Sequence, residues 1–175
     1  DDPSYFREEE SIHQLKLDNN YFVGRCRGQL QAVDLKALRN WDKVHILELY
    51  STMARELLAQ NISDLRATSV FVSPVSDQDL SGQYRPEAYV TAVMMQKQCV
   101  RALFHGKPLD SPSFLERAID CHDEMRWRHE FKTVIVNHDG EGHPNWHQQP
   151  DGTFTAWPQG DALKATKQLY DIIGS

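Results

Sequence analysis

Histidine and tryptophan side chains crowd one stretch of the sequence, from His122 to Trp157. The stretch holds five of the eight histidines and three of the four tryptophans of the 175-residue chain. Imidazole groups titrate near neutral pH, bind metals and transfer protons, and indole rings offer large apolar surfaces with one polar N–H group. This combination indicates either a site of histidine chemistry or a surface that binds another molecule.

A metal site is the first chemistry that this spacing allows. His143 and His147 are four residues apart, and His138 and Asp139 precede them in the same segment. Imidazole nitrogens and carboxylate oxygens are ligands that zinc and other borderline cations accept. Pro144 excludes a regular helix across the histidine pair. These four side chains would therefore hold a divalent metal such as zinc from a loop.

A hydrolytic site is the second chemistry, and it uses the same loop, residues 138–147. His143 and His147 would be its catalytic histidines, with Glu141 as the neighbouring carboxylate. Imidazole and carboxylate groups commonly act as general acids and bases. As an alternative to a binding function, the loop therefore predicts a histidine-dependent hydrolase in which a metal ion could assist.

The segment WHQQPDG, Trp146 to Gly152, precedes a predicted strand and helix. In this order it resembles the Trp-His-His branch of the His-Me-finger nucleases. The resemblance implies a nuclease-like hydrolase in which His147 activates water. Two features depart from that family: Gln148 stands in place of its second histidine, and residues 161–173 contain no histidine or asparagine ligand. The metal site of the family is therefore incomplete in this sequence.

A second local resemblance lies in RNWDKVH, Arg39 to His45. An arginine followed after a few residues by a histidine, with a polar residue such as Asn40 next to the arginine, resembles the signature of HEPN-type ribonucleases. In that family the two residues act on the scissile phosphate. The resemblance implies catalytic roles for Arg39 and His45, although the β-structure predicted below is unlike a purely helical HEPN domain.

A binding surface is the interpretation that we place first. Trp127, Trp146 and Trp157 combine large apolar rings with polar tips, a composition typical of interface hot spots. We expect a binding or regulatory protein that meets a protein partner or a small-molecule ligand through a His/Trp-rich hairpin. The alternative that these rings merely cover the sheet and the last helix stays open, as does the question whether the chain is an enzyme.

The overall composition favours a globular chain that does not bind polyanions. Nineteen lysines and arginines stand against 25 aspartates and glutamates, for a net charge of −6. Phosphate backbones attract clustered cations, so nonspecific binding to nucleic acid is not expected. No run approaches the ~20 apolar residues of a membrane helix. We expect a soluble protein, either cytoplasmic or exported as a mature chain.

Length and cysteine number indicate one domain with reduced thiols. A chain of 175 residues can form one sizeable core, so a single domain is expected over residues 1–175. The odd set of Cys26, Cys99 and Cys121 argues against full oxidation. Buried thiols are the expectation, and a Cys99–Cys121 bridge is the alternative.

The candidate residues must be positioned by the elements around them. Residues 131–136 are a run of β-branched and aromatic side chains typical of a buried strand. Pro150-Asp151-Gly152 is a turn signal between two further extended segments. Together these features predict a three-stranded antiparallel meander over residues 131–157, which would display the loop 138–147.

The rest of the pattern is mainly helical. Apolar residues recur every three to four positions in several segments, which indicates amphipathic helices. We predict helices over residues 3–17, 22–37, 38–60, 86–105, 113–128 and 161–173, a strand over 68–72 and an exposed loop over 76–85. The expected fold class is α+β, with five or six helices and a small antiparallel meander near the C-terminus.

Overall fold

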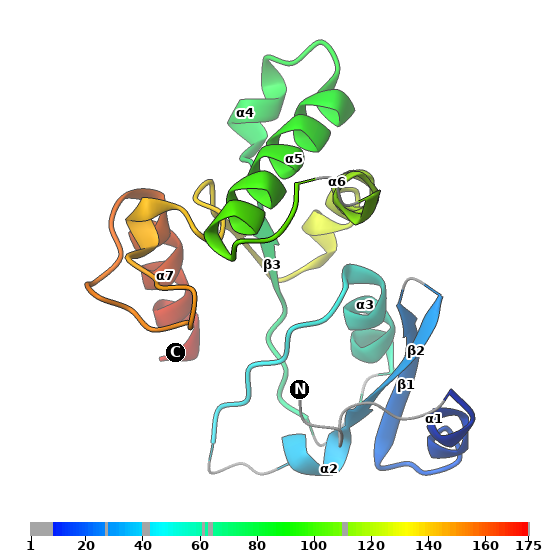
Figure 1. The fold of residues 1–175 in the computed structure, drawn as a ribbon. Coiled ribbons are helices and arrows are strands. Elements are labelled where there is room, and N and C mark those ends of the chain that lie inside the picture. Colours follow the sequence, from blue (N-terminus) through cyan, green and yellow to red (C-terminus); the bar gives the residue numbers. More distant parts are fainter. Residues whose placement is uncertain are drawn as a thin grey trace. The chain divides into compact units, whose positions relative to one another are not determined.

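The computed structural model describes residues 9–26, 28–39, 43–60, 62, 65–109 and 112–174 (Figure 1). The chain divides into two compact units, and the boundary in the sequence lies between Thr68 and Ser69. Each unit is described by itself below. This division does not test whether the chain is a single domain, so that expectation stays a prediction.

The described residues of the first unit form a β-hairpin and three helices. Its elements are α1 (Glu9–Leu15), β1 (Tyr21–Cys26), β2 (Gln29–Asp34), α2 (Leu35–Leu38) and α3 (Ser51–Ala59). β1 pairs with β2 in antiparallel register, from Tyr21 opposite Asp34 to Cys26 opposite Gln29. α3 packs on β1 (Figure 1). The buried core of this unit consists of Phe22, Cys26, Val33, Leu35 and Met53.

The helix predicted for residues 22–37 is wrong, because the hairpin occupies these positions. Phe22 and Cys26 are four residues apart, a spacing that puts them on one face of a helix and equally on one face of a strand. In the structure both are buried on the same side of β1. The connection between the strands contains Gly28 at φ +79°. This glycine is a turn signal, but the helix prediction placed it inside the helix.

The helix predicted for residues 38–60 is also wrong over most of its length. α2 ends at Leu38, residues 43–50 contain no helix, and α3 begins at Ser51. The stripe that suggested one long helix is not buried along its length: His45 and Ile46 are exposed, whereas Leu49 packs against the core. Apolar spacing alone does not make a helix when no core is there to cover it.

In the second unit, several helices connect two paired parallel strands. Its elements are β3 (Val70–Ser73), α4 (Asp77–Ser81), α5 (Pro86–Phe104), α6 (Pro112–Met125), η2 (Arg128–Glu130), β4 (Thr133–Val136), η3 (Pro144–Trp146) and α7 (Gly160–Ile173). β3 pairs with β4, with Val70 opposite Thr133 and Ser73 opposite Val136. Parallel strands need a long crossover connection, and α5 and α6, which pack against each other, belong to it (Figure 1).

The predicted C-terminal meander is wrong. β4 is a strand, as the apolar run indicated, but it pairs in parallel with β3 rather than with the segment that follows it. Over residues 137–157 the antiparallel pairing is limited to one isolated bridge, Gln148 with Phe154, around the turn at residues 150–152. The antiparallel sheet of this fold lies at residues 21–34, and the described residues form seven helices rather than five or six.

Several other local predictions are confirmed. Pro86 opens α5 in the first turn, and the strand over 70–73 and the helix over 160–173 lie within two residues of their expected positions. Cys26 is a buried free thiol, as expected, whereas the free thiols of Cys99 and Cys121 are only half-buried. The capping box expected at Ser113 lies outside the described side chains. No helix in the described part of the chain is long and apolar enough to cross a membrane.

Candidate functional site

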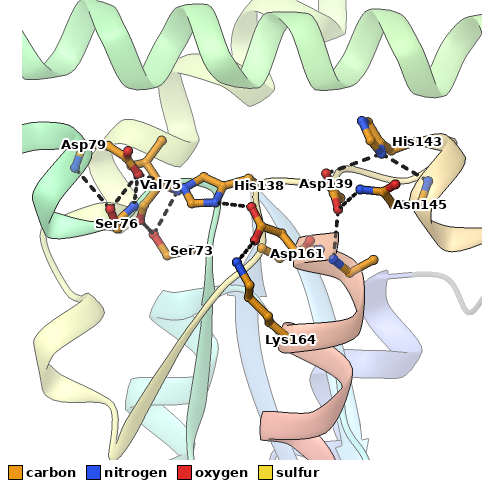
Figure 2. A network of polar contacts seen from close by, with 12 residues as sticks. Ser73, Val75, Ser76, Asp79, His138, Asp139, His143, Asn145, Asp161 and Lys164 are labelled. Carbon is orange, nitrogen blue, oxygen red and sulfur yellow. Dashed lines mark hydrogen bonds and ion pairs between the residues drawn. The ribbon is translucent and has the colours of Figure 1, made fainter. Parts of the chain in front are cut away.

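The carboxyl ends of β3 and β4 lie at the same edge of the sheet, because the strands are parallel. Ser76 and Asp79 follow β3, and His138 and Asp139 follow β4. Figure 2 shows these side chains in one network with Asp161 and Lys164 of α7. Such an edge, where several loops leave a sheet together, is the usual place for a functional site in α/β structure.

His138 lies between two carboxylates. Its Nε2 atom is 2.8 Å from Oδ2 of Asp79, and its Nδ1 atom is 2.8 Å from Oδ2 of Asp161 (Figure 2). Both ring nitrogens can donate to a carboxylate at once only when the ring is protonated. The hydrogen bond to Asp79 and that to Asp161 accordingly raise the pKa of His138. Through these two contacts the ring links α4 and α7 to the end of β4.

Each carboxylate in this cluster has a second partner. Asp79 and Ser76 form a capping box at the start of α4: the Asp79 backbone N–H donates to the Ser76 hydroxyl oxygen at 3.1 Å, and the Ser76 backbone N–H donates to Oδ2 of Asp79 at 2.7 Å. The Ser76 hydroxyl also donates to Oδ2 of Asp79 at 2.7 Å. The Ser76 hydroxyl and His138 lower the pKa of Asp79 to about 2. Lys164 donates to Oδ1 of Asp161 at 2.6 Å, and together with His138 it lowers the pKa of Asp161. Both carboxylates of the cluster are therefore ionised at neutral pH.

Asp139 is the buried carboxylate of the site, with 7% of its surface exposed. Its Oδ2 atom accepts hydrogen bonds of 2.9 Å from the Asn145 side-chain amide and from the backbone N–H of Ala162. Ala162 lies in the first turn of α7, where backbone N–H groups have no partner within the helix and the helix dipole favours an anion. These two bonds fix the carboxylate and leave Oδ1 to face His143.

His143 and Asp139 form an imidazole–carboxylate pair. Nδ1 of His143 is 3.3 Å from Oδ1 of Asp139 and also 3.3 Å from the Asn145 backbone N–H (Figure 2). The two contacts favour opposite tautomers, since one requires a proton on Nδ1 and the other a lone pair. The hydrogen bond in the structure is the one from Asn145, with Nδ1 as acceptor, whereas the Asp139 contact is within ion-pair distance only. The function proposed below instead assigns the proton to Nδ1, facing Asp139, because a bond to a charged acceptor is about twice as strong as a neutral one.

This assignment leaves Nε2 of His143 as the available nitrogen. The side chain is 41% exposed, and its Nε2 atom has no hydrogen-bond partner among the described residues. A half-exposed imidazole whose far nitrogen is held by a buried carboxylate has the arrangement of a general base.

Glu141 is not part of this pair. One of its oxygens is 2.7 Å from Nε of Arg101, and the other is 2.8 Å from Nε2 of His105. Arg101 is on α5 and His105 is the residue that follows this helix, so Glu141 links the loop to the C-terminal end of α5. Its predicted catalytic role finds no support in a contact with His143 or His147 in the described part of the chain.

His147 is held apart from the other loop histidines. Its backbone is left-handed at φ +49°, and its carbonyl oxygen accepts from the Thr155 backbone N–H at 2.8 Å. Its Nε2 atom is buried and, among the described residues, has no hydrogen-bond partner. The same residues contain no group of three or more histidine, cysteine or acidic side chains placed to hold a metal ion. Of the four predicted ligands, Asp139 and His143 lie together, whereas His138 contacts Asp79 and Asp161.

No protein-family model, curated protein or solved structure matches this chain. The function of the chain is therefore inferred from the geometry of the site. The two resemblances noted in the sequence, to the His-Me-finger nucleases and to the HEPN ribonucleases, gain nothing from these comparisons.

The three predicted tryptophans differ in their exposure and contacts. The indole N–H of Trp146 donates to the Asp139 carbonyl at 2.8 Å, which places this half-buried ring beneath the loop. Trp127 is also half-buried, at the start of η2. Trp157 is 60% exposed and stacks on Tyr170 of α7, with ring centres 6.2 Å apart and planes within 13°. Of the three rings, Trp157 is the most exposed to solvent.

Arg39 and His45 belong to the first unit and do not share a helix. Arg39 follows the last residue of α2 and is half-buried, whereas His45 is exposed in the segment before α3. The residue between them that completed the HEPN signature, Asn40, lies outside the described residues. The catalytic pair implied by that resemblance is therefore not supported by a shared helical face.

Sequence reasoning missed four members of the network. Asp79, Asn145, Asp161 and Lys97 surround the predicted loop residues. Lys97 of α5 donates to the Asn137 carbonyl, and burial lowers its pKa to about 8. Ser76-x-x-Asp79 is a recognisable capping-box pattern at a helix start, so α4 could have been found. Nothing in the local sequence indicates that Asp79 and Asp161 meet at His138.

Proposed function

We propose that the second unit is a hydrolase in which His143 acts as general base and Asp139 orients it. The observation that carries the proposal is the 3.3 Å contact between Nδ1 of His143 and Oδ1 of Asp139, a carboxylate that is buried and fixed by two N–H donors. Buried carboxylates that hold an imidazole in one tautomer stabilise the imidazolium formed during proton transfer. The Nε2 atom of the half-exposed His143 side chain is the proposed base.

In the proposed reaction, Nε2 of His143 takes a proton from water while the water oxygen bonds to the carbonyl carbon or phosphorus of an ester. The bond between that atom and the leaving oxygen then breaks, and the leaving oxygen takes the proton from Nε2. Asp139 keeps its negative charge throughout and offsets the transient positive charge of the ring. General-base catalysis of this kind contributes about 10²- to 10⁴-fold to a rate.

Hydrolysis of p-nitrophenyl acetate and of bis(p-nitrophenyl) phosphate tests the proposal and separates acyl from phosphoryl esters. His143→Gln is expected to lower kcat about 10²-fold or more. Asp139→Asn is expected to lower it less, because an amide oxygen still accepts from Asn145 and Ala162. His129→Gln is the matched control, since this ring is exposed and, in the described part of the chain, lies 4.0 Å from Asp77 and outside the His143–Asp139 pair.

Three outcomes decide the matter. Activity lost in His143→Gln and kept in His129→Gln supports the proposal. Equal activity in both variants, or no hydrolysis of either ester above the buffer rate, overturns it. Activity that requires added Zn²⁺ and disappears with EDTA would favour the metal-assisted hydrolase over a water molecule activated by His143 alone.

A binding function is the second candidate, and the exposure of Trp157 favours it. Trp157, Tyr170 and Phe154 are each more than half exposed, and the first two rings are stacked. Exposed aromatic side chains that lie together commonly mark the place where a protein partner or a small-molecule ligand binds. The surface would comprise these three residues rather than the full His/Trp-rich hairpin.

A further inference from the structure

Asn145 contacts both members of the imidazole–carboxylate pair. Its side-chain Nδ2 atom donates to Oδ2 of Asp139 at 2.9 Å, and its backbone N–H donates to Nδ1 of His143 at 3.3 Å (Figure 2). The side-chain contact stabilises the ionised carboxylate, whereas the backbone contact requires a lone pair on Nδ1 and so favours a proton on Nε2. Asn145 therefore acts on the same imidazole in two opposite directions.

Asp139 decides which of the two tautomers of His143 prevails. Its Oδ1 atom lies 3.3 Å from Nδ1 of His143 and favours a proton on that nitrogen. A neutral imidazole with its proton on Nδ1 leaves Nε2 as a base, and the other tautomer does not. The carboxylate outweighs the backbone N–H of Asn145 only while it is ionised and aimed at the ring. The amide of Asn145 is one of the two donors that hold it so.

The start of α7 leaves room for the Asn145 amide because residue 160 is a glycine. Gly160 has φ +54°, and a Cβ atom added there would lie 2.5 Å from Nδ2 of Asn145 and 3.6 Å from Oδ2 of Asp139. The backbone N–H of the preceding residue, Gln159, donates to the Asn145 carbonyl at 2.8 Å. The start of α7 thus holds the backbone of Asn145, and the glycine allows its side chain to approach Asp139 closely.

We propose that Asn145 is a positioning residue of the His143 site, which keeps Asp139 directed at Nδ1 of His143, and that Gly160 is required for this contact. The inference rests on the proposed hydrolase, to which it adds the group that selects the tautomer with a free Nε2 atom. Asn145 transfers no proton in the reaction. Its side chain acts on His143 through Asp139, against the preference of its own backbone N–H.

NMR of the ¹⁵N-labelled full chain tests the proposal, because protonated and unprotonated ring nitrogens differ in chemical shift. The spectra are recorded at pH 8, above the usual titration range of histidine, and the His143 signals are identified by their absence in His143→Gln. In the parent chain the proton is expected on Nδ1. Asn145→Ala removes the donor to Asp139, and the ratio of the Nδ1–H to the Nε2–H tautomer should fall about three- to tenfold.

Two further variants separate the chemistry of the amide from its shape. Asn145→Asp keeps the shape of the side chain but places a second carboxylate beside Asp139, and the two would repel and share a proton. The tautomer ratio should then fall about tenfold or more. Gly160→Ala should displace the amide and lower the ratio with Asn145 still present. If Gly160→Ala does not fold, Asn145→Ala, which only removes atoms, still decides.

Gly152→Ala is the matched control for Gly160→Ala. Gly152 is also left-handed, at φ +89°, but has open space around it, so its substitution should leave the tautomer ratio of His143 at the parent value. A ratio that changes equally in Gly152→Ala and Gly160→Ala would mean that general loosening of the unit moves the proton, and the positioning role would be overturned.

The positioning role and the hydrolase fail in different measurements. A proton on Nδ1 in the parent chain that stays there in both Asn145 variants overturns the role of Asn145 and leaves the hydrolase standing. A proton on Nε2 in the parent chain also overturns that role, because the backbone N–H of Asn145 would then have prevailed. A ratio that falls in Asn145→Ala and Gly160→Ala but not in Gly152→Ala supports it, even where neither ester is hydrolysed and the hydrolase alone is lost.

Discussion

The loop His138–His147 and the following segment Gln148–Trp157 are adjacent in the sequence and are held in opposite ways. The loop is bonded to α4 through His138, to α5 through Glu141 and to α7 through His138 and Asp139. The hydrogen bonds described for the segment run within it or back to His147, as from Gln149 to Thr153 and from Thr155 to His147.

This difference separates two kinds of surface residue. In the loop, ion pairs and backbone bonds fix the polar groups before any ligand arrives, which is the arrangement that catalysis requires. In the segment, Phe154 and Trp157 expose apolar rings on a turn held by local bonds. A rigid polar loop is suited to chemistry, whereas an exposed aromatic turn is suited to contact with a partner.

The largest expected effect compares a glycine in the loop with a glycine in the segment. Gly142 has φ +83°, and an added Cβ would lie 2.7 Å from Cβ of Phe104. Gly142→Ala should therefore destabilise the unit by about 2 to 4 kcal/mol, through left-handed backbone strain and the clash with α5. Gly152 has φ +89° and open space around it, so Gly152→Ala should cost about 1 kcal/mol.

Urea unfolding followed by tryptophan fluorescence measures both variants, since three of the four tryptophans lie in the second unit. Equal losses for Gly142→Ala and Gly152→Ala would mean that the loop is not packed against Phe104. The contrast between a held loop and a loosely held turn would then be lost.

The local elements of the second unit were readable from the sequence because their signals are local. Pro86 sets the start of α5, and the β-branched run before Asn137 identifies β4. The strand's partner was not readable in the same way. A near-continuous apolar run is typical of a strand in a parallel sheet, but its partner β3 lies about 60 residues earlier, across the crossover.

The candidate site divides along the same line. Asp139 and His143 are four residues apart in one loop, and the sequence identified both as candidates. The roles of His138 and Glu141 depend on side chains from α4, α5 and α7, which only the tertiary structure brings there. A histidine between two carboxylates is indistinguishable in the sequence from a metal ligand, and this explains why the metal site was proposed.

A medium effect is expected from His138, because it fastens the loop without taking part in the proposed chemistry. His138→Gln removes two charge-assisted hydrogen bonds at a site that is 42% exposed. After allowance for solvent screening, the loss is about 1 kcal/mol near pH 6. His143→Gln, which removes one 3.3 Å contact, should cost less stability but more activity.

The pH dependence follows from the direction of the shifts. The pKa of His138 is raised above 6.5, so its stabilisation is complete below pH 6.5 and is lost as pH rises through the higher folded value. The pKa of Asp79 is lowered from 3.8 to about 2, so its stabilisation is present above pH 3.8 and is lost as pH falls toward 2. The charged partners around the ring are Asp79 on α4 and Asp161 and Lys164 on α7, with Lys97 on α5 beside Asp139.

Urea unfolding of the parent chain and of His138→Gln at pH 5, 6, 7, 8 and 9 measures this contribution. The difference between the two proteins should be largest at the acidic end of that range and should shrink toward pH 9. A constant difference across the range would contradict a charged His138 clamp. His129→Gln provides the control, since its removal should leave the pH dependence of the parent chain unchanged.

The smallest effect on stability is expected for Trp157, an exposed residue of the segment Gln148–Trp157. Trp157→Ala should lower the free energy of unfolding by less than about 1 kcal/mol, because the ring is 60% exposed and its described ring contact is the stack on Tyr170. Trp146→Ala should cost more, because it removes a half-buried ring whose N–H donates to the Asp139 carbonyl.

Saturation-transfer NMR against neutral oligosaccharides and amphipathic peptides would then test binding, with signals that reach the Trp157 and Tyr170 rings and vanish in Trp157→Ala. A loss of stability above about 2 kcal/mol for Trp157→Ala would identify the ring as a structural residue, and the binding candidate would lose the observation on which it depends.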